Sequence, residues 1–450
     1  MSTSAHSVPA GLSLRANFSW TFVGNVVYAA CQWGMLVVLA KFGSPEMVGK
    51  FALGLAVATP ILAFATLKTR LVQATDAKRE YRFGDYLSLR LITTLLALLV
   101  VAGIALVSGY RQETVLVVLA MGIAKSFESI SDVYYGLLQQ HERMDRISKS
   151  KMIRGPLSLL GLGVGVYLTG SVFWGTVGLA VAWAAVLVGY DIRSGALILR
   201  LAPGQSSLVS GRSDEQESLR PRWEMRTLAR LAWLALPLGI VITLDSLRTS
   251  IPRYFLQMHL GEAELGIFAA MAYLRQAGNI VSVALGLAAC PRMAKYYAAR
   301  NGSAFRRLLL RLVGINALLG ALGVLAAVVA GREILTFLYR PEYAGRQDVF
   351  VVLIVAAGID FVGTALDYGM TAARYFRVQV PLFAAITGAT ILVCLWQVPS
   401  AGLRGAALAV LVATVVYAGG SLAVVLHALR ALHRHRAEDE PFERLSTSQV

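Results

Sequence analysis

The sequence has little charge and few cysteines for its length. Charged residues make up 15% of its 450 residues, whereas about a quarter is usual for a soluble globular protein. Its three cysteines, Cys31, Cys290 and Cys394, form no CxxC pair and have no spacing suited to a metal. The histidines have no acid or thiol ligand set around them. We therefore expect no metal site and no cofactor.

What the sequence has instead is long apolar runs. Hydrophobic residues make up 56% of the chain and the mean hydropathy is +0.62. The runs are about 17 to 25 residues long, which is the length that an α-helix needs to cross roughly 30 Å of hydrocarbon. They predict an all-α polytopic membrane protein with twelve spans, near 17–40, 48–67, 87–108, 114–138, 153–170, 172–190, 228–250, 265–289, 308–330, 349–371, 379–397 and 403–429. The N-terminal residues lack a signal-peptide pattern, so we expect them to remain on the mature protein.

The basic residues indicate the orientation of these spans. A net charge of +16 would suggest nucleic acid as the partner of a soluble protein. Here most Lys and Arg residues fall in alternate loops, on the side of the two termini. The positive-inside rule then predicts an inner membrane protein with both termini in the cytoplasm, in contact with lipid headgroups and not with nucleic acid.

A long polar segment divides the spans into two sets of six. It runs from 200 to 226 and is rich in Ser, Gly, Pro and charge, as linkers are. We predict an N-terminal lobe at 1–199, a cytoplasmic linker at 200–226, a C-terminal lobe at 227–430 and a cytoplasmic tail at 431–450. The sequence VGKF at 48–51 can be laid on LGIF at 265–268, which favours a duplicated six-helix unit with a transport site between its copies.

Ionisable side chains inside the spans mark candidate ion sites. Lys125, Glu128 and Asp132 share one face of the fourth span, and Asp360 and Asp367 share one face of the tenth. Charge is costly in hydrocarbon, so these groups should face protein or a wet cavity. They are candidates for a proton or sodium site that drives transport. The alternative is an internal ion-pair cluster that stabilises the bundle.

Two long segments resemble a known family. They read NFSWTFVGNVVYAACQWGMLVVLAKFGSPEMVGKFALGLAVATP and IPRYFLQMHLGEAELGIFAAMAYLRQAGNIVSVALGLAACPRMAKYY, and they resemble bacterial polysaccharide-biosynthesis flippases, the Wzx-type branch of the multidrug/oligosaccharidyl-lipid/polysaccharide exporters. The resemblance implies two six-helix bundles in a V with a central cavity. It also implies, as substrate, an undecaprenyl-pyrophosphate-linked oligosaccharide flipped to the periplasmic leaflet, with a polysaccharide polymerase as a further partner.

In the resembled fold the first, second, seventh and eighth spans line the cavity. Asn25 and Gln32 would then contact sugar or pyrophosphate, or else form hydrogen bonds between helices. Arg275, with Asn279 one turn further along the eighth span, has the donor fork that suits phosphate. Its alternative is a salt bridge to an acid on a neighbouring helix. We expect Arg248 and Arg253 to receive the headgroup on release.

Two other functions compete with a flippase. A drug exporter of the same superfamily would prefer acids to Arg275 in its cavity, because its substrate is cationic. A membrane glycosyltransferase or polymerase would need acid/base groups or a metal presented on an adequate loop. The sequence shows no such constellation, so we expect a transporter and not an enzyme.

Overall fold

The computed structural model describes residues 14–76, 80–201, 218–375 and 378–447. Within these ranges, twelve helical segments are long and apolar enough to span a membrane, which confirms the predicted all-α fold. The fifth of these twelve segments begins at Met144 and not near residue 153 as predicted. The sequence pattern missed its first turns because Lys149, Lys151 and Arg154 interrupt the apolar run there.

Contacts divide the chain into two compact units, 1–246 and 247–450. The predicted lobe boundaries stay a prediction, and most of the predicted linker lies outside the described residues. The first unit contains α1 (Leu14–Phe42), α2 (Pro45–Thr66), α3 (Thr69–Thr75), α4 (Phe83–Val107), α5 (Gln112–Gln140), α6 (Met144–Thr169), α7 (Val172–Val186), a π-helical turn η1 (Leu187–Asp191), α8 (Ile192–Leu201) and the beginning of α10 (Met225–Ala298).

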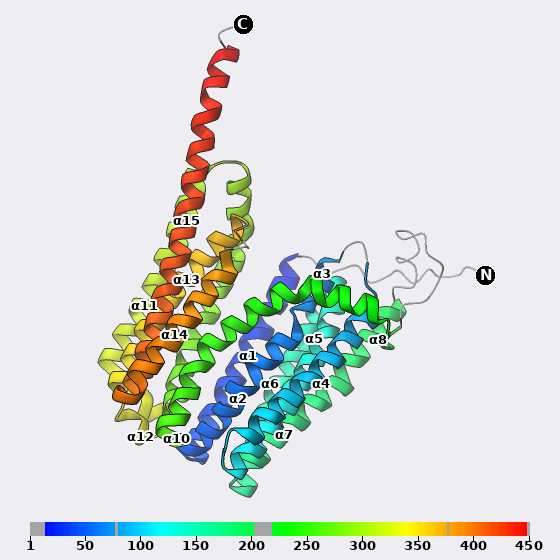
Figure 1. Ribbon diagram of the computed structural model, residues 1–450, viewed down its shortest axis with the longest axis vertical. Coiled ribbons are helices and arrows are strands. Elements are labelled where there is room, and N and C mark those ends of the chain that lie inside the picture. Colours follow the sequence, from blue (N-terminus) through cyan, green and yellow to red (C-terminus); the bar gives the residue numbers. More distant parts are fainter. Residues whose placement is uncertain (1–13, 77–79, 202–217, 376–377, 448–450) are drawn as a thin grey trace, which may run out of the picture. The chain divides into compact units, whose positions relative to one another are not determined.

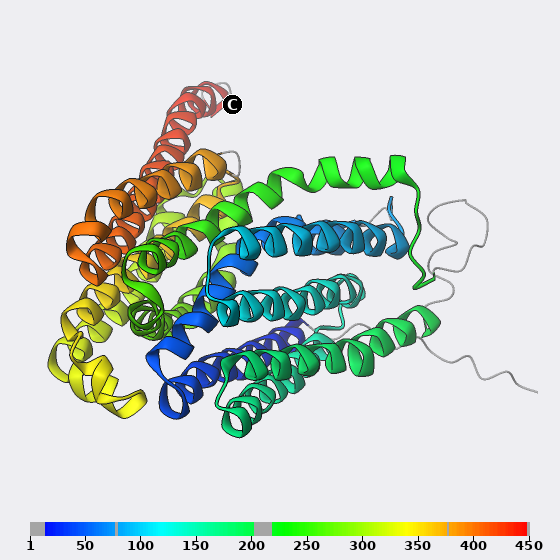
Figure 2. The same ribbon diagram turned by 60° about the horizontal axis from the view of Figure 1, so that its bottom comes forward.

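In the first unit α1 packs along α6 and α6 along α7, while α5 contacts α2, α4 and α7. Figures 1 and 2 show these helices side by side. Glycines allow the closest approach, because a Cβ at Gly178 would lie 2.2 Å from the carbonyl oxygen of Gly161. Small residues commonly mediate such backbone contacts in membranes. The backbones of α6 and α7 therefore pack in direct contact. This contact fixes the position of α6 in the first unit.

The beginning of α10 belongs to the core of the first unit. Leu228, Leu231 and Ala235 are buried in one cluster with Leu67 and Phe83. The helix continues into the second unit and has non-helical backbone angles at Gly261, with φ 81° and ψ −172°. That region is open essentially only to glycine. Gly261 therefore separates two candidate spans, Met225–Leu260 and Glu262–Ala298.

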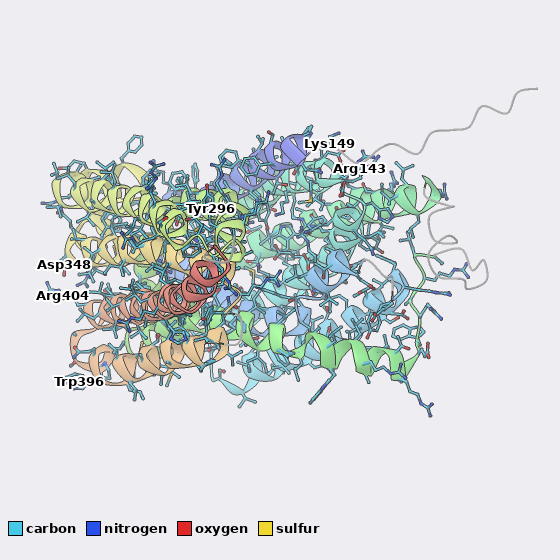
Figure 3. The ribbon with its side chains drawn as sticks, turned by 90° about the horizontal axis from the view of Figure 1, so that it is seen from above. Arg143, Lys149, Tyr296, Asp348, Trp396 and Arg404 are labelled. Atoms are coloured by element: carbon cyan, nitrogen blue, oxygen red, sulfur yellow. The ribbon has the colours of Figure 1, made fainter. Side chains whose placement is uncertain are left out.

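The second unit contains the remainder of the chain. Its further helices are α11 (Gly302–Leu338), α12 (Pro341–Ala344), α13 (Gln347–Ala372), α14 (Gln379–Ala401) and α15 (Leu403–Thr447). α13 packs between α11 and α15, and α14 packs on α15. At one end of this unit the Arg404 guanidinium donates to the Asp348 carboxylate, and Figure 3 shows the two residues next to each other.

Candidate functional site

The site begins where α2 ends. Leu67 and Lys68 follow α2 with φ values of 46° and 48°, a left-handed conformation that is uncommon for residues other than glycine. Lys68 is also the N-cap of α3. Strained residues of this kind persist where the surrounding structure holds them, and they cluster at functional sites. Here the double turn interrupts the second span and brings Lys68 and Arg70 to the wall of a cavity.

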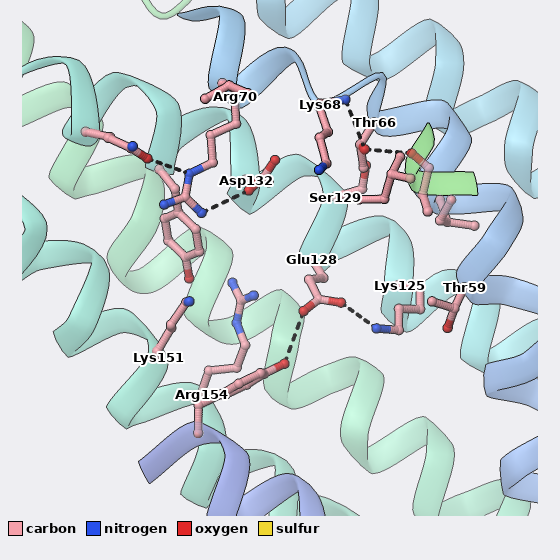
Figure 4. Close-up of a pocket in the computed structure, with 17 residues that line it drawn as sticks. Thr59, Thr66, Lys68, Arg70, Lys125, Glu128, Ser129, Asp132, Lys151 and Arg154 are labelled. Atoms are coloured by element: carbon pink, nitrogen blue, oxygen red, sulfur yellow. Dashed lines mark hydrogen bonds and ion pairs between the residues drawn. The ribbon is translucent and has the colours of Figure 1, made fainter. Parts of the chain in front are cut away.

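This cavity has a volume of about 540 Å³ and lies within the first unit. It is lined by Tyr28, Thr59, Leu62, Ala63, Thr66, Lys68, Arg70, Leu71, Lys125, Glu128, Ser129, Asp132, Tyr135, Gln139, Lys151, Arg154 and Ile242. Figure 4 shows the charged side chains converging on it from several helices. Five lining residues are cationic and two are acidic, an excess of three positive charges. We call this pocket the cationic cavity.

The two acids of the cationic cavity each accept hydrogen bonds from neighbours. The Lys125 ammonium lies 2.7 Å from Glu128, and the Tyr28 hydroxyl donates to the same carboxylate over 3.1 Å. Arg70 donates to Asp132 over 3.3 Å and to Gln139 over 3.0 Å. The charge of both carboxylates is therefore compensated inside the protein. Neither carboxylate neutralises the other cations of the cavity.

A second arginine, Arg90, forms an ion pair with Asp132 from outside the cavity. Arg90 is 1% exposed, and its Nη2 lies 3.6 Å from the Asp132 carboxylate and donates to Thr69 over 2.6 Å. Its Nη1 donates to Ser129 over 3.1 Å. Arg90 does not line the cavity, so it adds positive charge behind the wall without contacting the space itself.

The two lysines Lys68 and Lys151 differ from the other cations of the cavity. Within the described part of the chain, neither forms an ion pair with a carboxylate; the Lys151 ammonium donates to the neutral Asn25 side chain over 2.8 Å. Both lysines are half-buried, and removing a cation from water without an anionic partner is costly. Anionic ligands compensate lysines of this kind, so the cavity has the chemistry of an anion site.

The structure places the predicted site residues in both units. In the first unit Lys125, Glu128 and Asp132 line the cationic cavity, and Asn25 accepts the bond from Lys151. Gln32, four residues after Tyr28 on α1, does not line it; its Nε2 is buried and has no hydrogen-bond partner among the described residues.

In the second unit Arg248 donates to Asp360 over 3.3 Å and stacks on the Tyr417 ring at 5.2 Å. Arg248, which we predicted to contact the substrate, is therefore paired with Asp360, which we predicted to bind the coupling ion. Within the described part of the unit, Arg253 Nε and Asn279 Oδ1 are buried without a hydrogen-bond partner. The remaining predicted residues, Arg275 and Asp367, are half-buried on α10 and α13, and their roles stay predictions.

Sequence reasoning missed four cations of the cavity: Lys68, Arg70, Lys151 and Arg154. They stand at the ends of apolar runs, where basic residues normally mark the cytoplasmic boundary of a span. The one feature of the sequence that could have indicated them is their position relative to the membrane. All four flank spans at the same predicted side of the membrane, and in the structure Arg70 pairs with Asp132 of the acidic stripe on α5.

Known proteins share both the sequence pattern and the fold. Residues 14–297 match the polysaccharide biosynthesis protein family. The capsular polysaccharide biosynthesis protein CapF of Staphylococcus aureus is 25% identical over 406 residues, which cover 89% of this chain and 96% of CapF.

Solved structures of two kinds of transporter resemble the chain. The lipid II flippase MurJ in an inward closed conformation superposes with a TM-score of 0.69 at 11% identity, covering 94% of this chain and 92% of MurJ. An inward-facing multidrug resistance transporter of the MATE family superposes with a TM-score of 0.60 at 15% identity, covering 94% and 96%. These likenesses show that the chain shares the fold of these two proteins. The chain is a multi-pass membrane protein and belongs to the polysaccharide biosynthesis protein family.

Proposed function

We propose that this protein is a flippase that carries an undecaprenyl-pyrophosphate-linked oligosaccharide from the cytoplasmic to the periplasmic leaflet by alternating access. The observation that carries the proposal is the excess of positive charge in the cationic cavity, with Lys68 and Lys151 lacking a carboxylate partner among the described residues. A diphosphate diester has two negative charges, and Arg and Lys donors suit its oxygens. An organic cation, the expected substrate of a drug exporter, would be repelled there.

The position of the cavity along the predicted spans is consistent with this substrate. Lys68 lies at the turn near the end of the second span, Lys151 is the eighth residue of α6, and Gln139 is near the end of α5. With cytoplasmic termini, all three positions face the cytoplasmic half of the membrane. A lipid-linked sugar assembled in the cytoplasm presents its diphosphate at that depth, so the headgroup would enter the cationic cavity first.

The orientation is itself a proposal with a direct test. We expect single cysteines at Ser108 and Ser400 to react with an impermeant thiol reagent applied from the periplasm, and a cysteine at Glu142 to react only after the membrane is opened. All three positions are exposed ends of helices, and the background would have Cys31, Cys290 and Cys394 replaced. Labelling of the Glu142 position in intact spheroplasts would reverse the proposed topology.

Reconstituted protein tests the function. Proteoliposomes containing the purified protein should flip a fluorescent undecaprenyl-pyrophosphate-linked oligosaccharide, while efflux of a cationic dye from the same vesicles should stay at the level of empty liposomes. We also propose coupling to a proton or sodium gradient through acids such as Glu128, Asp132, Asp360 and Asp367, so an imposed gradient should accelerate flipping. Dye transport without lipid flipping would favour a drug exporter instead, and flipping unaffected by either gradient would remove the coupling role.

A further inference from the structure

The π-helical turn η1 carries a buried carboxylate behind the cationic cavity. A π-helical turn inserts one extra residue into an α-helix and so rotates the residues that follow it; such turns are rare and often lie at functional sites. Here η1 (Leu187–Asp191) joins α7 to α8 and ends on Asp191. The Asp191 side chain is 0% exposed. It does not line the cavity, and the ligand assignments made above do not use it.

Asp191 holds two side chains of α6. The Ser150 hydroxyl donates to its Oδ1 over 2.6 Å, and Arg154 Nη2 donates to its Oδ2 over 3.0 Å. Ser150 is also hydrogen bonded to the Tyr135 hydroxyl at 2.7 Å. Arg154 and Tyr135 both line the cationic cavity. The carboxylate on the π turn is therefore hydrogen bonded directly to one cavity residue, Arg154, and through Ser150 to a second, Tyr135.

The Arg154 guanidinium is fixed on three sides. Its Nη2 donates to Ser131 over 2.6 Å as well as to Asp191, and its Cζ lies 5.6 Å from the Tyr135 ring centre and 5.8 Å from that of Trp183. Among the described residues nothing accepts from Nη1. Figure 4 shows the guanidinium pointing into the space between Lys151 and Glu128. The geometry leaves Nη1 as the donor that faces a bound anion.

We propose that Asp191 is a positioning residue for anion recognition: the π turn presents its carboxylate to Nη2 of Arg154, and this bond directs Nη1 of Arg154 toward the diphosphate. The inference rests on the proposed function, because it assumes that the cavity binds a diphosphate. A guanidinium already held in place loses little conformational entropy when the ligand arrives, so preorganisation strengthens binding. Removing the Asp191 charge would free Arg154 to turn toward Glu128, a cavity acid that Lys125 and Tyr28 already contact.

The test measures binding of geranylgeranyl diphosphate to the detergent-solubilised full chain, with geranylgeraniol as the uncharged control ligand. We expect Asp191→Asn to bind the diphosphate about tenfold more weakly than wild type, the size of one charge-assisted hydrogen bond. Arg154→Gln should weaken it at least as much. Because Asp191 acts through Arg154, the double variant should bind no more weakly than Arg154→Gln alone.

Asp85→Asn is the matched control. Asp85 is another buried carboxylate of the first unit, 2% exposed, but it accepts from the Arg82 backbone amide at the start of α4 and does not line the cavity. This variant should lose thermal stability and keep wild-type affinity. If Asp191→Asn does not accumulate, Asp191→Glu replaces it, since the longer side chain displaces the carboxylate and should also weaken binding.

The outcomes separate the two proposals. Wild-type protein that binds the diphosphate no better than geranylgeraniol would overturn both the anion site and the role of Asp191. Diphosphate binding that is unchanged in the folded Asp191 variant, or losses that simply add in the double variant, would overturn the positioning role alone. Equal weakening by Asp85→Asn would show that general loss of stability explains the effect, and would overturn it too.

Discussion

Replacing both Lys68 and Lys151 with glutamine is expected to abolish diphosphate binding and to slow flipping of the lipid-linked oligosaccharide by about a hundredfold or more. Each lysine supplies a charge-assisted contact, and such contacts contribute about 1.5 to 3 kcal/mol apiece. The fold should tolerate the change because neither ammonium forms an ion pair with a carboxylate within the described ranges. Flipping in proteoliposomes, normalised to folded protein, measures the effect.

Lys149→Gln provides the control for this experiment. Lys149 is exposed on the same helix, two residues before Lys151, and lies 5.3 Å from the Trp20 ring centre; it does not line the cavity. It should flip the substrate at the wild-type rate. Normal flipping by the folded Lys68→Gln/Lys151→Gln protein would show that the cationic cavity is not the diphosphate site.

The membrane spans were predictable because their signal is local. An apolar run of the right length forms a helix in lipid whatever its neighbours are, and all twelve predicted runs coincide with helices. The stripe of Lys125, Glu128 and Asp132 was predictable for the same reason, since i, i+3 and i+7 share a helix face. Their placement on one wall of a cavity agrees with the expectation that intramembrane charge faces protein or water.

The rest of the cationic cavity depends on tertiary packing. Lys68 and Lys151 are 83 positions apart in the sequence and look like ordinary boundary lysines; only the left-handed turn after α2 and the close packing of α6 bring them to one space. Asp191 was equally hidden, because a single π turn has no sequence pattern that distinguishes it from the surrounding helix. Nor does spacing reveal that Arg248 pairs with Asp360, 112 residues away.

Breaking the ion pair between Arg248 and Asp360 is expected to lower the stability of the protein strongly. Asp360 is 5% exposed, and the Arg248 guanidinium lies between its carboxylate and the Tyr417 ring. Removing one partner of a buried pair strands the other charge and typically costs about 3 to 5 kcal/mol. We therefore expect Arg248→Gln to lower the melting temperature and the membrane abundance strongly.

Neutralising both partners distinguishes a structural pair from a substrate contact. If the pair mainly stabilises the second unit, Arg248→Gln/Asp360→Asn should recover most of the lost melting temperature, because no buried charge remains unpaired. Arg404→Gln is the control: Arg404 pairs with Asp348 at an exposed site, its side chain 74% accessible, where removing an ion pair changes stability by less than about 1 kcal/mol. If Arg248→Gln melts like wild type and loses only flipping, Arg248 contacts the substrate as the sequence predicted. If the double variant regains stability but no longer responds to an imposed ion gradient, Asp360 serves coupling as well as structure.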